Sequence, residues 1–202
     1  MRIIKEILKV SEIKNKVISI NLDEFKNKIK DGYSKAKFSN MANFYNSLLI
    51  AKNEEADLIY FVEDDYLHFE NSLTDMINTY ERVSSQIEKD IIICPCDYPF
   101  NYMSNEKTNI LIGSNQHWRT VQKILCTFMI SKKMLEKYWD NLIKTCEKRH
   151  DPFEKYINEI LLNEIGISPI NTLSIHLTNV NSSYGLSPFV DIKKLWDENK
   201  PS

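Results

Sequence analysis

A short apolar run that ends in three acids is the feature that most constrains this chain. Residues 58–62 read Leu-Ile-Tyr-Phe-Val, and their length and β-branched and aromatic content predict a buried strand, although periodicity alone leaves a buried helix segment open. Glu63, Asp64 and Asp65 follow directly. Ligands gather at the carboxyl ends of strands in open α/β sheets. Three adjacent carboxylates repel one another unless a cation or a proton relieves them. The stretch therefore predicts either a Mg²⁺-type site or a solvated acidic turn.

Hydrophobic periodicity divides the chain into alternating helices and strands. We expect helices over 2–10, 23–30, 39–52, 70–88, 131–144 and 151–166, with Ser39 and Ser131 as N-caps. We expect strands over 17–20, 58–62, 90–94, 110–112, 124–130 and 173–177. Strands that alternate with helices predict an α/β sandwich with a mostly parallel central sheet.

Composition places the chain among ordinary globular proteins. Its 202 residues fit one domain, and its formal net charge of −2 argues against general attraction to nucleic acid. No apolar segment approaches the length of a membrane span, and the first eight residues are too short and too charged for a signal peptide, so we expect a cytoplasmic location. Four cysteines lack zinc-finger spacing, and we expect them to be buried and reduced: Cys94, Cys96, Cys126 and Cys146.

Two further stretches carry residues suited to a site. His117, Trp118 and Arg119 interrupt a polar connection, where Trp offers a flat face for a sugar ring and Arg a fork for phosphate, although an aromatic anchor for the loop explains them as well. Asp151, followed by Pro152 and Glu154, has the pattern of a capping box that opens a helix.

Three motifs together resemble a family. Residues 60–68 (YFVEDDYLH) resemble the DXD region of GT-A glycosyltransferases of the family 2 type, especially a bacterial subgroup. Residues 117–120 (HWRT), then 176–177 (HL) with 186–191 (LSPFVD), resemble the same subgroup in the same order, so the likeness covers about residues 17–191. The resemblance implies one GT-A-like domain over 1–202. It also implies transfer of a sugar, with inversion, from a nucleotide-sugar to a glycan, lipid-linked or protein acceptor, with Mn²⁺ or Mg²⁺ as cofactor.

The resemblance also assigns roles to single residues. Asp65 is the expected direct metal ligand, Glu63 lies near the metal or the ribose, and Asp64 supports the donor site. His176 completes the metal shell, although a single His beside apolar residues is also typical of an ordinary core or surface position. Asn40 and Asn43 contact the donor, His117, Trp118 and Arg119 line the substrate rim, and Asp151 is the expected general base, with His117 and Asp191 next in order. His68 is expected to be structural or to lie on the acceptor side.

The N-terminal part departs from that family. A complete GT-A domain opens with two βα units before the helix that precedes the acidic strand, whereas only one strand, at 17–20, is expected here. We therefore expect a reduced nucleotide-binding half, with the strand at 17–20 near an open sheet edge. Two other functions stay open: a catalytically weak remnant that binds a nucleotide, a glycan or a protein, and another metal-dependent nucleotide enzyme such as a nucleotidyltransferase. Peripheral contact with a membrane is also left open.

Overall fold

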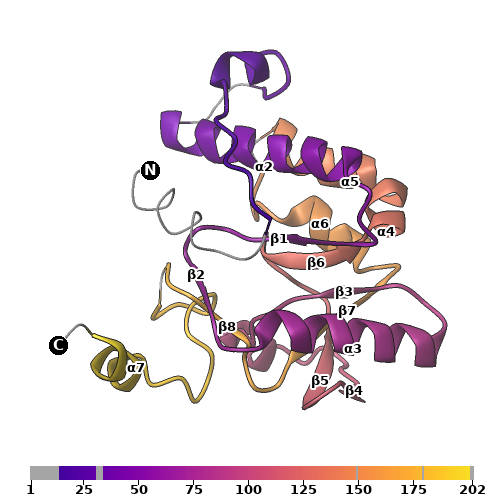
Figure 1. Ribbon diagram of the computed structural model, residues 1–202, viewed down its shortest axis with the longest axis vertical. Coiled ribbons are helices and arrows are strands. Elements are labelled where there is room, and N and C mark those ends of the chain that lie inside the picture. The colour runs from indigo at the N-terminus through magenta and orange to yellow at the C-terminus, as the bar shows by residue number, and fades with distance from the viewer. Residues whose placement is uncertain (1–13, 31–33, 149, 179, 201–202) are drawn as a thin grey trace.

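The computed structural model describes residues 14–30, 34–148, 150–178 and 180–200, and the helix expected over 2–10 lies outside them. Six strands form one sheet in the order β1-β6-β3-β7-β5-β4 (Figure 1). Their bounds are β1 Leu58–Phe61, β3 Ile91–Ile93, β4 Ile110–Ile112, β5 His117–Val121, β6 Phe128–Ser131 and β7 Ile165–Pro169. A second sheet pairs β2 (Tyr66–His68) with β8 (Ser174–His176). The chain is therefore an α/β protein with two sheets.

The large sheet is mostly antiparallel, so the expectation of a mostly parallel sheet is wrong. Of its five strand pairs, β3 with β7 is parallel and the other four are antiparallel. β4 and β5 are joined by a short connection without a helix, and consecutive strands of this kind pair antiparallel. β6 follows β5 in the chain but does not pair with it; β6 lies between β1 and β3 and runs antiparallel to both.

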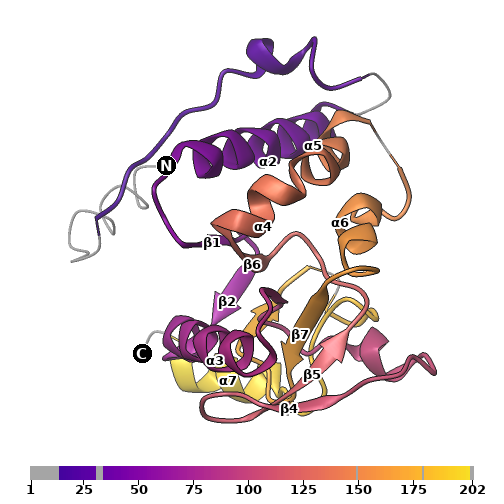
Figure 2. The ribbon, with the colours of Figure 1, turned by 90° about the vertical axis from the view of Figure 1, so that its right-hand side faces the viewer.

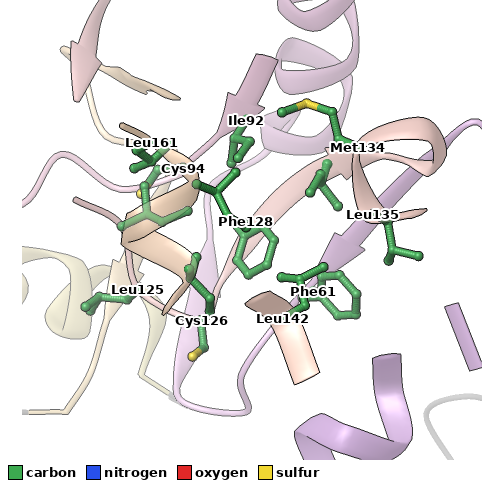
Figure 3. Close-up of a cluster of buried hydrophobic side chains, with 14 of the residues drawn as sticks. Phe61, Ile92, Cys94, Leu125, Cys126, Phe128, Met134, Leu135, Leu142 and Leu161 are labelled. Carbon is green, nitrogen blue, oxygen red and sulfur yellow. The ribbon is translucent and has the colours of Figure 1, made fainter. Parts of the chain in front are cut away.

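Helices cover both faces of the large sheet. One face carries α2 (Lys35–Asn53), α4 (Lys132–Lys137), α5 (Trp139–Glu147) and α6 (Lys155–Ile160), and α3 (Ser72–Ile87) covers the other (Figure 2). Side chains that alternate along a strand serve both cores. Ile92 packs under α4 and α6, for example, while Ile91 and Ile93 pack under α3. Phe61 and Phe128 meet at the centre of the first core, with ring centroids 5.3 Å apart (Figure 3). The four cysteines are buried and free, as expected.

Several expected elements are confirmed. The strands at 58–62, 90–94, 110–112 and 173–177 and the helix at 70–88 appear as β1, β3, β4, β8 and α3. Ser131 caps α4, because its hydroxyl accepts a hydrogen bond from the Met134 amide at 3.1 Å. Two short 3₁₀ helices, η1 (Leu22–Phe25) and η2 (Pro99–Tyr102), and a last helix, α7 (Ile192–Asn199), complete the described chain.

Other expected boundaries are wrong. Residues 17–20 form an exposed, irregular segment instead of a strand, and α2 begins after Ser34, whose hydroxyl accepts from the Lys37 amide, and not after Ser39. Residues 23–30 hold only η1 and a turn, and the strand expected over 124–130 begins at Phe128. Within the described sheet β1 is an edge strand, and because residues 17–20 form no strand, the expectation of a strand there near an open edge is wrong.

The expected helix at 151–166 is the largest correction. The Asp151–Pro152 peptide bond is cis, α6 begins at Lys155 with Glu154 at the cap position, and β7 starts at Ile165. Because α6 begins at Lys155 with Glu154 at the cap position, Asp151 lies three residues before that cap and does not fill it. Among the described residues, no helix is long and apolar enough to cross a membrane.

Candidate functional site

The turn after β1 brings Asp65 against His176. β2 follows the three acids and pairs antiparallel with β8, with Tyr66 opposite His176. The amide of Leu177 donates to the backbone oxygen of Asp65 at 2.8 Å, and His176 Nε2 lies 3.3 Å from Asp65 Oδ2. Two residues that are 111 positions apart in sequence thus meet at the carboxyl end of β1.

Aromatic rings and a backbone carbonyl fix the orientation of His176. Its ring stacks on Tyr66 at 4.6 Å between centroids and meets the edge of Tyr98 at 6.3 Å. His176 Nδ1 lies 2.8 Å from the backbone oxygen of Tyr184, which can only accept, so Nδ1 carries the proton. In the neutral imidazole the Nε2 lone pair then faces a carboxylate oxygen of Asp65. The lone pairs of these two acceptors repel one another, and a proton or a cation between them would remove that repulsion.

The two carboxylate oxygens of Asp65 differ in their hydrogen bonding. Thr178 Oγ1 donates to Asp65 Oδ2, whereas Asp65 Oδ1 is buried and has no hydrogen-bond partner among the described residues. Buried carboxylate oxygens are normally satisfied. The orphaned oxygen next to His176 is therefore a reason to expect a ligand there.

Glu63 and Glu154 add a second pair of carboxylates. The Glu63 residue keeps contact with solvent. Even so, loss of hydration around its carboxyl raises the pKa of that group to about 7, and the negative charges of Asp65, Glu154 and Asp64 raise it further. Burial also raises the pKa of Glu154, and nearby His176 opposes that rise. The site thus holds two carboxyl groups with raised pKa values, of which that of Glu63 reaches about 7, and general acid–base chemistry uses groups of this kind.

Glu154 and the aromatic support were missed from the sequence. The pattern at 151–154 was interpreted as a capping box, which gave Glu154 a local role on its own helix. Thr178, Tyr184 and Tyr98 carried no motif of their own, and only the pairing of β2 with β8 brings them to the acids. In the sequence, the one sign that Glu154 could belong to the site is that it is a carboxylate two positions after Pro152.

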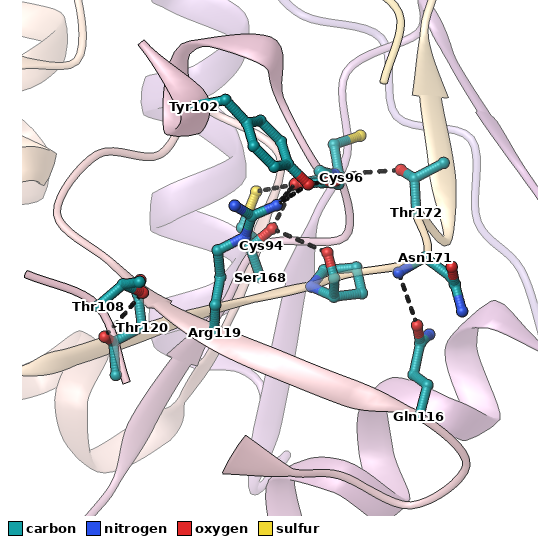
Figure 4. Close-up of polar contacts among 12 residues, drawn as sticks. Cys94, Cys96, Tyr102, Thr108, Gln116, Arg119, Thr120, Ser168, Asn171 and Thr172 are labelled. Carbon is teal, nitrogen blue, oxygen red and sulfur yellow. Dashed lines mark hydrogen bonds and ion pairs between the residues drawn. The ribbon is translucent and has the colours of Figure 1, made fainter. Parts of the chain in front are cut away.

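The three residues of the HWR motif lie elsewhere. β5 is separated from β1 by β6, β3 and β7 in the sheet. Trp118 is fully buried beneath α3, so its indole offers no face to a sugar. Arg119 is buried and pairs with Asp97, with its guanidinium 4.0 Å from the ring centroid of Tyr102 (Figure 4). His117 is exposed at the start of β5. The structure therefore gives Trp118 and Arg119 supporting positions in place of the expected rim.

The remaining predicted residues are not joined to the acids by any contact among the described residues. Asn40 and Asn43 are exposed on α2, and Asp151 is exposed before α6. Asp191 caps α7 by accepting from the Lys194 amide at 3.0 Å. His68 Nε2 lies 2.5 Å from the Tyr60 hydroxyl.

A hollow opens beside the acids on the α3 side of β1. Its volume is about 520 Å³, and its lining combines aromatic, aliphatic and hydroxyl side chains: Tyr60, Val62, His68, Phe69, Asn71, Ser72, Leu73 and Thr74. The hollow is open to solvent over much of its extent, so it encloses a ligand only in part.

The residues fit a cation that is only partly held by protein. Among the described residues, no group of three or more His, Cys, Asp or Glu side chains is arranged to hold a metal ion. Mg²⁺ is commonly bound through one or two carboxylates together with substrate phosphates. Asp65 Oδ1 and His176 Nε2 are suited to that partial shell, with Glu63 close by.

Comparison with known proteins gives no relative. A scan against protein-family models found no match, and a search of curated proteins found no significant match.

Proposed function

We propose that this protein is a GT-A-type glycosyltransferase that moves a sugar, with inversion, from a nucleotide-sugar to a glycan, lipid-linked or protein acceptor. The observation that carries the proposal is the pair of Asp65 and His176 at the carboxyl end of β1, with Asp65 Oδ1 left unpartnered. Asp65, His176 and Glu63 would hold Mn²⁺ or Mg²⁺. The bound cation would offset the charge that develops on the leaving diphosphate.

Glu154 is the better-supported base. A general base works best when its pKa lies near the working pH, and the raised pKa of Glu154 moves it in that direction. Its charge also raises the pKa of Glu63, so the two carboxylates lie close enough to influence one another. Within the described part of the chain no hydrogen bond or ion pair joins Asp151 to the acids, and its expected role as base gains no support from the geometry. In this scheme Glu63 and Asp64 contact the donor, and His68 with the hollow beside it is on the acceptor side.

A second candidate is a catalytically weak remnant that binds a nucleotide or a glycan. The edge position of β1 and the irregular segment at 17–20 favour it, because they reduce the nucleotide-binding half of the domain.

Turnover separates the two candidates. The purified protein is incubated with UDP-, GDP-, CMP- and dTDP-sugars and Mn²⁺, and release of the nucleotide is followed with and without acceptor glycans. A transferase releases the nucleotide from one donor, and Glu154→Gln abolishes that release. Binding of a donor or of a glycan without release would favour the remnant, and binding of neither would reject both.

A further inference from the structure

The end of the molecule formed by η1 and α2 carries an excess of positive charge. Between residues 14 and 37 three acids, Asp23, Glu24 and Asp31, accompany seven lysines: Lys14, Lys16, Lys26, Lys28, Lys30, Lys35 and Lys37. The whole chain has a net charge of −2, so the rest of it is acidic. In Figures 1 and 2, η1 and α2 form the upper end of the molecule, opposite α3 and α7, and the segment before η1 runs down from that end along one side. Seven lysines against three acids give residues 14–37 a formal charge of +4, in contrast to the rest of the chain.

The seven lysines are presented to solvent. All are exposed, and within the described ranges the ion pair recorded for them is Lys26 with Asp23, at 2.6 Å on the surface. Lys28 lies over the rings of Phe25 and Tyr45, 5.1 and 5.5 Å from their centroids. These contacts leave most of the positive charge available to an external partner.

Exposed aliphatic side chains accompany the lysines. Val17 and Ile18 each keep 45% of their surface exposed, directly after Lys14 and Lys16. Lysines next to exposed β-branched side chains suit a membrane interface. The apolar side chains can enter the boundary between headgroups and acyl chains, while the lysines stay at the phosphates. Single-stranded nucleic acid would instead be met by aromatic stacking and arginine. Residues 14–37 contain no arginine, and Phe25 is buried.

We propose that this basic end, defined by the seven lysines with Val17 and Ile18, docks on an anionic phospholipid surface. The argument is charge complementarity, since juxtamembrane lysines are attracted to acidic headgroups within about a Debye length. The inference does not depend on the proposed transferase activity. If that activity holds, docking would deliver the protein to a surface where lipid-linked acceptors are found.

Vesicle sedimentation with matched charge reversals tests the proposal. Lys35→Glu with Lys37→Glu changes two exposed lysines in the first turn of α2, where acidic side chains favour the helix dipole and the fold is kept. Lys193→Glu with Lys194→Glu is the control, because these lysines are exposed in the first turn of α7 at the opposite end. Each pair is measured on phosphatidylcholine vesicles with and without phosphatidylglycerol, at low and high sodium chloride.

The expected result is binding that requires phosphatidylglycerol and is lost in high salt. One lysine near such a surface changes partitioning by about fivefold, so the α2 pair should weaken it by about 25-fold or more, while the α7 pair leaves it nearly unchanged. Val17→Ser with Ile18→Ser should weaken binding further without altering the salt dependence. Absence of binding to anionic vesicles, or equal loss in both lysine pairs, would overturn the proposal. Equally tight binding to single-stranded RNA would also overturn it, because the surface would then be a general polyanion site.

Discussion

Replacing Glu63 by Gln should make the protein more stable at alkaline pH. Folding raises the pKa of this carboxyl from 4.5 to about 7, so the folded state holds the proton more tightly than the unfolded chain does. The stability that comes from protonated Glu63 is therefore fully present below about pH 4.5 and is lost as the pH rises through about 7. Above that range the charged carboxylate destabilises the fold, and Gln removes this cost.

The size of the effect follows from the shift. A rise of the Glu63 pKa from 4.5 to about 7 corresponds to at most about 3.4 kcal/mol of unfolding free energy. Glu63 keeps contact with solvent, which screens its charge, so about 1–2 kcal/mol is the reasonable expectation. For a chain of this length that gain raises the melting temperature by roughly 2–8 °C.

Urea and thermal unfolding of the wild type and Glu63→Gln at pH 5 and pH 8 provide the measurement. The unfolding free energy of the variant should be close to that of the wild type at pH 5 and should exceed it at pH 8. Glu136→Gln on the exposed side of α4 controls for the loss of one surface carboxylate. A variant that is no more stable than the wild type at pH 8 would refute the view that loss of hydration, together with neighbouring acids, destabilises the charged Glu63 carboxylate.

Three further variants test the placement of individual residues. Glu154→Gln should lower turnover by roughly 10²–10⁴-fold while Asp151→Asn keeps it, and the reverse result would return the role of base to Asp151. Trp118→Ala should cost about 3–5 kcal/mol of unfolding free energy in urea, because the indole is fully buried; a stable variant that loses donor or acceptor binding would instead support the substrate rim. Arg119→Met should cost about 3–5 kcal/mol by leaving Asp97 buried without its partner, and adding Asp97→Asn should restore part of that loss; equal instability of the double variant would argue against the ion pair.

The local sequence predicts the acidic strand and its neighbours well. Short runs of neighbouring residues are enough to predict these elements: the strands Leu58–Phe61 and Ile91–Ile93 and the helix Ser72–Ile87. The meeting of Asp65 with His176 depends on β2 and β8, two strands of three residues each, and its prediction came from resemblance alone. Strand direction was mispredicted, since alternation of elements does not reveal where β6 inserts between β1 and β3.

Tertiary context overrode local signals at two sites. Asp151 with Pro152 and Glu154 has every residue of a helix start, but the helix begins at Lys155, and Glu154 lies near enough to His176 for the charge of His176 to oppose the rise in the Glu154 pKa. Trp118 has the composition of a ligand platform, and the register of β5 on β7 directs it into the core instead. Residue type alone does not distinguish these outcomes, because burial is decided by partners distant in sequence.

Titration of nucleoside diphosphates tests the central claim most directly. The wild type and Asp65→Asn are titrated by calorimetry with UDP, GDP and dTDP in Mn²⁺ and in EDTA. We predict that Mn²⁺ strengthens the binding of one diphosphate to the wild type and that Asp65→Asn abolishes the gain while its melting temperature is kept. Equal affinity in Mn²⁺ and in EDTA would contradict a cation site at Asp65 and His176.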